Sequence, residues 1–318
     1  MSLVNPWRNG HGRAAAERIL RAACGPRIRS SFPLAPLTSF RLGGPAALYL
    51  EAESEADLAA ASEAVGATGI PWAVIGKGSN LLVSDRGFTG LVIRLGKGFR
   101  WAAREGSHLH AGGSMPLPAL SGVALAHSLA GLEFGVAIPA SMGGAVRMNA
   151  GAHGRSMSEV LGPIELFRLD RGDRSAFPAA EAGFSYRRSS LPDGAIVIAA
   201  TVALRPGDIT EIRKVMEEAR AWRRATQPLA EPNCGSVFKN PPDDHAARLI
   251  EAVGGKGVSV GGASVSMKHA NFIVAGPGAN AEDVWRLIRS LQERVEKRFG
   301  ISLEPEVQLV GDFDLAAI

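Results

Sequence analysis

Residues 135–154 read Gly-Val-Ala-Ile-Pro-Ala-Ser-Met-Gly-Gly-Ala-Val-Arg-Met-Asn-Ala-Gly-Ala-His-Gly, a run of small residues with one arginine and no acidic side chain. Small residues at this density allow the backbone to approach another group closely. Two interpretations are open. The segment packs tightly, helix against helix, or it forms a wall against the fused rings of a cofactor, with Ser141 and Asn149 offering hydrogen bonds.

A second glycine-rich segment lies earlier in the chain, where the apolar run 71–75 leads directly into Gly76-Lys77-Gly78-Ser79-Asn80. A strand that ends in such a loop leaves several backbone N–H groups free to converge on an anion. The loop lacks the ending of a Walker loop, and it lacks the third glycine and following helix of a dinucleotide-binding fingerprint. Taken alone, such a loop is more often an ordinary tight turn. Two such segments in one region favour a cofactor.

The rest of the chain alternates between strand-like and helix-like patterns, which predicts an α+β protein. Helices are expected at residues 13–23, 54–66, 117–130, 209–224, 245–253 and 281–299, and strands at 46–52, 71–75, 81–83, 91–95, 109–111, 164–169, 196–204, 258–260, 272–274 and 303–310. The composition shifts at Arg205-Pro206-Gly207-Asp208. We therefore expect an N-terminal arm with a short helix (1–33), a domain of two subdomains (34–205, divided near 96) and a C-terminal domain (206–318).

Composition and charge exclude several classes of protein. Charged residues make up 21% of the 318 residues, as in ordinary globular proteins, and the net charge is only +4. With 6% aromatic residues and no concentrated basic patch, a nucleic-acid partner is not expected. Every apolar stretch is interrupted before it reaches the length of a membrane span, so we expect no membrane insertion. Cys24 and Cys234 have no disulfide or metal-ligand spacing, which favours a reducing, cytoplasmic location and no metal.

Three further segments carry side chains suited to chemistry. Tyr186-Arg187-Arg188 is either a surface pair of arginines or a planar clamp for a carboxylate or phosphate. Residues 232–241 form a stiff turn that presents a hydroxyl, an ammonium and an amide. Cys234 within it is a weak candidate for a nucleophile, because no histidine partner is evident. In the expected last strand, alternation places Glu304 and Glu306 on the same face. Glu304 fits an exposed acid, and Glu306 fits a partly buried acid near a basic clamp.

These segments, taken in order, resemble the UDP-N-acetylenolpyruvoylglucosamine reductase (MurB) family, in its shorter second type. The resemblance is carried by Thr38-Ser39-Phe40-Arg41-Leu42-Gly43-Gly44, Gly76 to Val83, Gly135 to Gly154, Tyr186-Arg187, Gly235-Ser236-Val237-Phe238-Lys239-Asn240-Pro241 and Leu303 to Val307. It implies an FAD-binding domain of the p-cresol methylhydroxylase/vanillyl-alcohol oxidase type, followed by an α+β substrate domain. It also implies that NADPH reduces UDP-N-acetylglucosamine enolpyruvate to UDP-N-acetylmuramate, a peptidoglycan precursor, through non-covalent FAD.

The resemblance also implies roles for individual residues. The catalytic positions are Arg187, Ser236 and Glu306. The expected FAD contacts are Gly76, Lys77, Gly78, Ser79, Asn80, Leu81, Ile138, Pro139, Ser141, Met142, Gly143, Gly144, Met148, Asn149, Gly151, Ala152 and Gly154. The expected substrate contacts are Tyr186, Arg223, Lys239 and Asn240, and we expect a monomer.

A mechanism follows from these roles. Arg187 would stabilise the charge that develops on the substrate carboxylate, and Glu306 could share a proton with that carboxylate if burial raises its pKa. Ser236 would then protonate the substrate carbon. Two rival interpretations remain. One is an FAD oxidase or dehydrogenase of the same fold, and the other is a non-catalytic protein whose glycine loops serve only packing.

Overall fold

The computed structural model describes residues 11–313, which form two compact units. Segments 11–32, 46–76 and 89–217 belong to the first unit, and segments 33–45, 77–88 and 218–313 to the second. Helix α5 (Ile209–Thr226) runs from the first unit into the second. The units interleave along the sequence, and the division of the chain near residues 33 and 205 stays a prediction.

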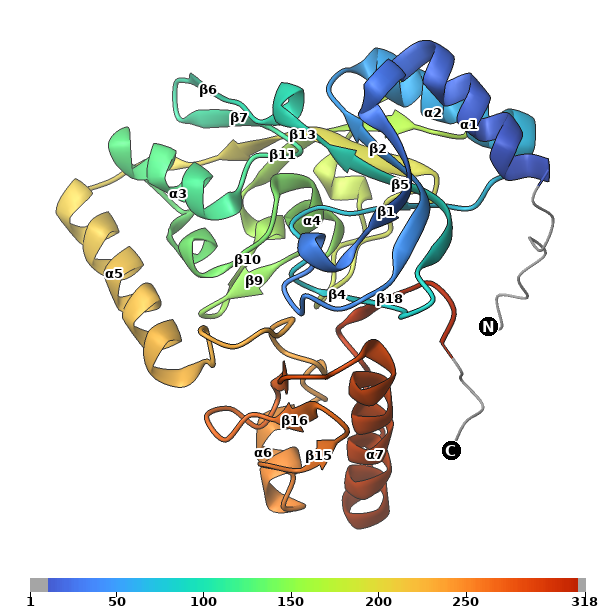
Figure 1. Cartoon of the computed structure of the whole chain (residues 1–318). Coiled ribbons are helices and arrows are strands. Elements are labelled where there is room, and N and C mark those ends of the chain that lie inside the picture. The colour runs from blue at the N-terminus through green and yellow to red at the C-terminus, as the bar shows by residue number, and fades with distance from the viewer. Residues whose placement is uncertain (1–10, 314–318) are drawn as a thin grey trace. The chain divides into compact units, whose positions relative to one another are not determined.

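A four-stranded sheet forms one part of the first unit. Its strand order is β1-β2-β5-β3, with β1 at Ile28–Pro33, β2 at Pro45–Ala52, β5 at Phe88–Leu95 and β3 at Trp72–Val74. Helices α1 (His11–Cys24) and α2 (Glu55–Thr68) lie side by side on this part of the unit (Figure 1). Helix α2 begins at Ser54, whose side chain accepts the N–H of Asp57, and it ends at Gly69 in the left-handed conformation.

A five-stranded antiparallel sheet forms the other part of the first unit. Its order is β12-β11-β13-β7-β6, with bounds Asp173–Phe177, Leu161–Arg168, Ala195–Ala203, His108–Gly112 and Ala102–Glu105. Strand β13 is buried on both faces, which explains its nearly continuous apolar sequence. Ile196 and Ile198 enter the core shared with α1 and α2, whereas Val197 and Val202 enter the core shared with α3 (Leu117–Ala126) and α4 (Met142–Arg147). Two short pairs complete the unit, β8 (Leu129–Ala130) with β14 (Arg205–Pro206) and β9 (Gly151–Ala152) with β10 (Arg155–Ser156).

The second unit is a small α+β assembly with its own core. Its antiparallel sheet has the order β15-β16-β17, with bounds Ser259–Val260, Ala263–Val265 and Ile273–Ala275. Helices α6 (Ala246–Ala252) and α7 (Ala281–Phe299) pack with this sheet (Figure 1). A parallel pair, β4 (Leu81–Val83) with β18 (Gln308–Val310), joins segment 77–88 to the end of the chain. Short 3-10 turns occur at Gly25–Arg27, Ala35–Leu37, Lys97–Phe99, Glu133–Ala137, Met157–Glu159 and Ala179–Glu181.

The expected α+β class is confirmed, and two expected elements are wrong in extent. The helix expected at 117–130 ends at Ala126, because Ser128 adopts a positive φ of 52° and Leu129–Ala130 pairs with β14. The strand expected at 303–310 is reduced to β18, since Pro305 has no N–H and the N–H of Glu306 donates to Val237 O. Glu304 and Glu306 are therefore not alternate residues of one strand. Among the helices that the structure describes, none combines the length and apolar character that a membrane span requires.

Candidate active site

Gly76, where the earlier glycine-rich loop begins, touches segment 135–154 within the first unit. A Cβ on Gly76 would lie 2.5 Å from the hydroxyl oxygen of Ser141, so the end of β3 touches the start of α4. Ser141 is the N-cap of α4, and its side chain accepts the N–H of Gly144. The contact joins Gly76 to segment 135–154, whereas the rest of the loop, from Lys77 to Asn80, belongs to the second unit.

Much of the glycine content of residues 135–154 is explained by packing inside the protein. A Cβ on Gly143 would lie 2.9 Å from Val197 O, and one on Gly151 would lie 2.4 Å from Arg155 O. The close approach is therefore of helix α4 on strand β13, and not of helix on helix. Gly154 differs, because its φ is 75° and no atom lies within 4 Å of its Cβ position. The expected helix–helix packing is therefore wrong, packing on strands explains Gly143 and Gly151, and the space beside Gly154 is open.

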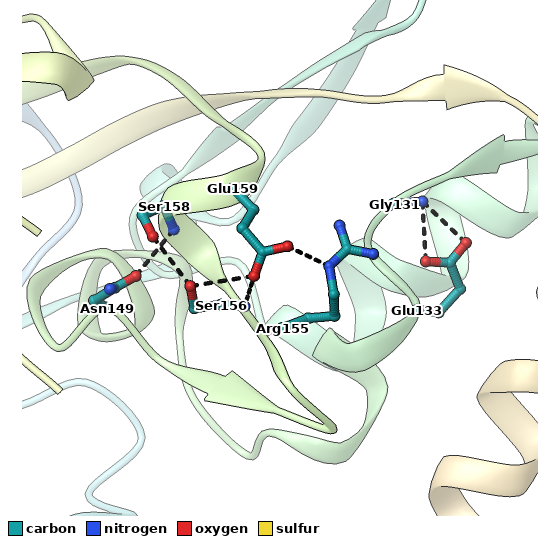
Figure 2. A network of polar contacts seen from close by, with 7 residues as sticks. All are labelled: Gly131, Glu133, Asn149, Arg155, Ser156, Ser158 and Glu159. Atoms are coloured by element: carbon teal, nitrogen blue, oxygen red, sulfur yellow. Dashed lines mark hydrogen bonds and ion pairs between the residues drawn. The ribbon is translucent and has the colours of Figure 1, made fainter. Parts of the chain in front are cut away.

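Asn149 connects segment 135–154, the wall expected to face the cofactor, to the loop that carries Arg187. Its Nδ2 donates to Ser185 O at 2.9 Å, and its Oδ1 accepts the N–H of Ser158 at 2.9 Å. Figure 2 shows the second contact continuing through Ser156 to the carboxylate of Glu159. Asn149 is buried and has a positive φ of 41°. Its amide therefore has a role within the protein in addition to the FAD contact that remains a prediction.

Arg187 occupies a tight turn that faces the same wall. Ser185 and Arg188 exchange two backbone hydrogen bonds, which leaves Tyr186 and Arg187 at the tip of the turn. Arg187 has a φ of 55°, its guanidinium donates to Gly151 O at 2.9 Å, and its Cζ lies 5.1 Å from the Tyr186 ring centroid. Of the arginine pair, Arg187 is half-buried and Arg188 is exposed. The clamp interpretation therefore fits Arg187, and the surface interpretation fits Arg188.

Sequence reasoning missed Arg147, which holds the far end of the same loop. Its guanidinium donates to the carbonyls of Leu191, Pro192 and Ala195, and its own carbonyl accepts the hydroxyl of Ser189. Burial lowers the pKa of Arg147. A single arginine inside an otherwise uncharged segment is the signal that could have identified it.

The other expected FAD contacts of this segment lie around α4. Ile138 and Pro139 precede α4, Met142 and Gly144 lie within it, Met148 follows it, and Ala152 lies in β9.

The loop after Gly76 belongs to the second unit and is held by its own contacts. Gly78, with a φ of 64°, accepts the N–H of Ser39 on its carbonyl at 3.0 Å. Asn80 donates through Nδ2 to Glu306 O at 3.0 Å and accepts the N–H of Gln308 on its own carbonyl. Within residues 11–313, the backbone N–H groups of Gly78, Ser79 and Asn80 donate to no protein acceptor. The half-buried loop thus presents backbone donors suited to a phosphate, and the expected FAD contact stays a prediction. Lys77 is exposed beside it, and Leu81 begins β4.

The second unit also brings Ser236 and Glu306 onto neighbouring backbone. The N–H of Glu306 donates to Val237 O at 2.7 Å, and the N–H of Lys239 donates to Glu304 O at 2.9 Å. Ser236 is half-buried and follows Gly235, which has a φ of 81°. No hydrogen bond to its side-chain hydroxyl is formed by any residue between 11 and 313, so this hydroxyl is available to a ligand.

The charged groups around Ser236 are arranged asymmetrically. The Lys239 ammonium lies 2.6 Å from the carboxylate of Glu304, whose side chain is 70% exposed, so Glu304 is the surface acid of the pair. Burial raises the pKa of the Cys234 thiol, and the nearby charge of Glu306 raises it further. Cys234 is therefore an unreactive core residue and not a nucleophile. Asn240 Oδ1 accepts the N–H of Ala246 at the start of α6.

Arg223 lies near the end of α5 and donates through Nε to Gln227 Oε1 at 2.9 Å. Burial lowers the pKa of Arg223. The expected site residues are divided between the two units. The first unit contains Gly76, the expected FAD contacts from Ile138 to Gly154, Tyr186 and Arg187. The second unit contains Lys77 to Leu81, Arg223, Ser236, Lys239, Asn240 and Glu306.

Two protein-family models match parts of this chain. Residues 46–165 match an FAD binding domain, and residues 227–310 match the C-terminal domain of UDP-N-acetylenolpyruvoylglucosamine reductase. The reductase of Anaeromyxobacter sp. (strain Fw109-5) is 46% identical over 301 residues, covering 95% of this chain and 93% of that protein. The reductase of Heliobacterium modesticaldum is 45% identical, covering 88% and 90%. The crystal structure of the Thermus caldophilus enzyme superimposes with a TM-score of 0.78 at 36% identity, covering 89% of this chain and 99% of that one. The chain belongs to the UDP-N-acetylenolpyruvoylglucosamine reductase family.

Proposed function

We propose that this protein is an FAD-dependent oxidoreductase that uses NADPH to reduce UDP-N-acetylglucosamine enolpyruvate to UDP-N-acetylmuramate for peptidoglycan synthesis. The observation that carries the catalytic assignment is the hydrogen bond from Glu306 N–H to Val237 O. It holds the expected proton donor, Ser236, and the expected acid, Glu306, on adjacent backbone. Family membership supports the cofactor and the reaction.

The residues of the FAD segments suit such a cofactor. The N–H groups of Gly78, Ser79 and Asn80 are available to the pyrophosphate, and the open Cβ position of Gly154 leaves room beside the wall. We assign the remaining FAD contacts to Gly76, Lys77, Leu81 and residues 138–152 named above. FAD, when bound, supplies the hydride chemistry, while the chain supplies binding, orientation and charge.

Arg187 orients and stabilises the enolpyruvyl carboxylate. Adding a hydride to the vinyl carbon pushes an electron pair into the carboxylate, and a planar guanidinium can donate two parallel hydrogen bonds to the charge that develops there. The positive φ of Arg187 and its bond to Gly151 O hold the guanidinium against the wall before substrate arrives. Donors that are fixed in advance need no reorganisation during the reaction.

Ser236 delivers a proton to the adjoining carbon of the substrate. A hydroxyl is a weak acid in water, but the carbon of an enolate is strongly basic, so a hydroxyl held over it suffices. The Ser236 hydroxyl has no partner within the described residues, which leaves its proton available for this step. Glu306 shares a proton with the substrate carboxylate, and Tyr186, Arg223, Lys239 and Asn240 bind the rest of the sugar nucleotide.

The test is an anaerobic absorbance titration of the flavin-loaded protein. NADPH should bleach the flavin band, and UDP-N-acetylglucosamine enolpyruvate should rapidly restore it. Ser236→Ala should leave the bleaching step nearly unchanged and slow the restoring step severely, and equal losses in both steps would exclude the proton-donor role. A protein that stays bleached until air enters would instead be an oxidase.

We further propose that the protein acts as a monomer in the cytoplasm. Both cysteines are unpaired, as expected in a reducing compartment, which supports the proposed location. Sedimentation velocity at micromolar concentration tests the first statement, and cell fractionation tests the second.

A further inference from the structure

We propose that Asn271 is a positioning residue that fixes the backbone on which Ser236 is carried. The inference rests on the proposed role of Ser236 and extends it to a residue with no expected contact to substrate. Asn271 lies in the turn before β17, far from Ser236 in sequence, and it was not among the expected site residues.

The Asn271 side chain forms the two hydrogen bonds with the Phe238 backbone that a neighbouring strand would otherwise form. Its Oδ1 accepts the Phe238 N–H at 3.0 Å, and its Nδ2 donates to Phe238 O at 2.8 Å. Its own backbone carbonyl accepts the N–H of Val237 at 2.9 Å. An asparagine amide has the same donor and acceptor as a peptide group, so it can satisfy both polar groups of one residue. Three hydrogen bonds thus bind Asn271 to the two residues that follow Ser236.

The opposite side of this segment is bound by the residues around Glu306. Val237 O accepts the N–H of Glu306, and Lys239 N–H donates to Glu304 O. The segment from Val237 to Lys239 is therefore held between Asn271 and residues 304–306. This double attachment sets the position of Ser236 relative to Glu306, and its loss on one side would release the segment to shift.

Water cannot replace the Asn271 amide at this place. Asn271 is 4% exposed, and Val237 and Phe238 are each 1% exposed. A buried backbone group that loses its partner carries the full cost of its desolvation, about 1–3 kcal/mol. An apolar residue at 271 would leave the N–H and C=O of Phe238 unpaired, so the backbone would move to find other partners.

Asn271 is itself held in place by its turn. Its N–H donates to Nδ1 of His269 at 3.2 Å, and Phe272 N–H donates to His269 O. Burial, followed by the nearby charge of Lys256, lowers the pKa of His269, which keeps the ring neutral and able to accept. The His269 ring also packs edge-on against Phe272, with 4.7 Å between ring centroids. The amide is therefore presented to Phe238 by a rigid support.

The experiment compares both half-reactions in stopped-flow absorbance for Asn271→Leu and Asn271→Asp. Leucine has the same number and branching of side-chain heavy atoms and forms neither bond to Phe238, whereas aspartate keeps the acceptor oxygen and replaces the donor. Because a misplacement of about 1 Å can cost about 100-fold in rate, we expect reoxidation by UDP-N-acetylglucosamine enolpyruvate to slow by about 10- to 100-fold in both variants. Reduction by NADPH should stay within about twofold, a split that general destabilisation would not produce.

Two further variants separate the possible failures. Asn280→Ala is the matched control, because it removes an asparagine amide that caps α7 in the same unit and should lower stability without splitting the half-reactions. Ser236→Ala tests the proposed function directly. If it leaves reoxidation intact, the role of Ser236 fails independently of Asn271.

If Ser236→Ala slows reoxidation but the Asn271 variants do not, or slow both steps equally, the positioning role is overturned. Failure of both Asn271 variants to yield folded, flavin-loaded protein, with Asn280→Ala intact, would also overturn it and make Asn271 a folding residue.

Discussion

Replacing Gly78 with alanine should weaken FAD binding strongly. Gly78 is buried, and its φ of 64° lies in the left-handed region that residues with a Cβ rarely adopt. A Cβ at this position would lie 2.0 Å from Leu37 O and 2.9 Å from the Cα of Thr38. Both contacts are with backbone, so the loop or segment 37–39 must move by about 1 Å to reach normal separation.

The magnitude follows from the contacts that hold the loop. The left-handed conformation costs an alanine about 1–2 kcal/mol relative to glycine. The movement also breaks the two hydrogen bonds that Gly78 O accepts from the N–H and the hydroxyl of Ser39, each contributing about 1 kcal/mol. The sum is about 3–4 kcal/mol. If the loop relaxes in the free protein and must be restored on binding, FAD affinity falls by about 100- to 1,000-fold.

The assay is titration of FAD-free protein with FAD, followed by flavin fluorescence, together with urea unfolding of the FAD-free form. Gly66→Ala is the matched control, since Gly66 lies in α2 with no atom within 4 Å of its Cβ position. That change should stabilise the protein by about 0.5–1 kcal/mol and leave FAD affinity unchanged. If Gly78→Ala binds FAD with parental affinity and unfolds at the parental urea concentration, the strain argument is refuted. A large loss of stability with unchanged affinity would confine Gly78 to a structural role.

Three further predictions concern single groups. Arg187→Lys keeps the positive charge but loses the planar fork, so we expect the rate of reoxidation by substrate to fall about 100- to 1,000-fold, and a loss under threefold in stopped flow would contradict the clamp. Burial alone would raise the pKa of Asp57, but the Glu53 N–H and Arg27 lower it below its ordinary 3.8. Its contribution to stability is therefore complete above pH 3.8 and is lost as the pH falls through the lower folded-state pKa. In urea unfolding between about pH 2 and 5, the free energy of unfolding should decline less steeply with falling pH for Asp57→Asn than for the parent. Burial raises the pKa of the Cys24 thiol to about 11, so a thiol reagent at neutral pH should label it only after unfolding, and rapid labelling of the native protein would contradict its burial.

Elements with a strong local pattern could be predicted from the sequence. Helix α7 matches its expected bounds, because an Asn280–Asp283 capping box begins it and Gly300, with a φ of 68°, ends it. Helix α2 similarly begins at its expected start, where Ser54 is the N-cap. In contrast, α4 was hidden in a glycine-rich stretch whose helix propensity is low, and it is formed because Met142 and Gly143 donate to the carbonyls of residues 115 and 113.

The candidate site was predicted as a set of residues but not as a set of contacts. The order of the glycine loops, Arg187, Ser236 and Glu306 along the chain was sufficient to predict the family, which the comparisons confirm. The roles of these residues stay predictions. Arg147 is marked as the one arginine of an uncharged segment, but neither its partners nor those of Asn271 could be predicted from local sequence, because the groups that they bind lie far away in the chain.

Capping, periodicity and side-chain type are local properties, so the class of fold, the ends of the well-capped helices and the candidate site residues could be predicted from the sequence. The folded chain alone shows that Gly76 touches Ser141, that Asn149 holds the turn of Arg187 and that Asn271 completes the hydrogen bonds of Phe238. Each of these is a pairing between buried polar or backbone groups from distant segments. Such pairings depend on how the chain is brought together, because a buried group must be satisfied by whichever neighbour the fold places beside it.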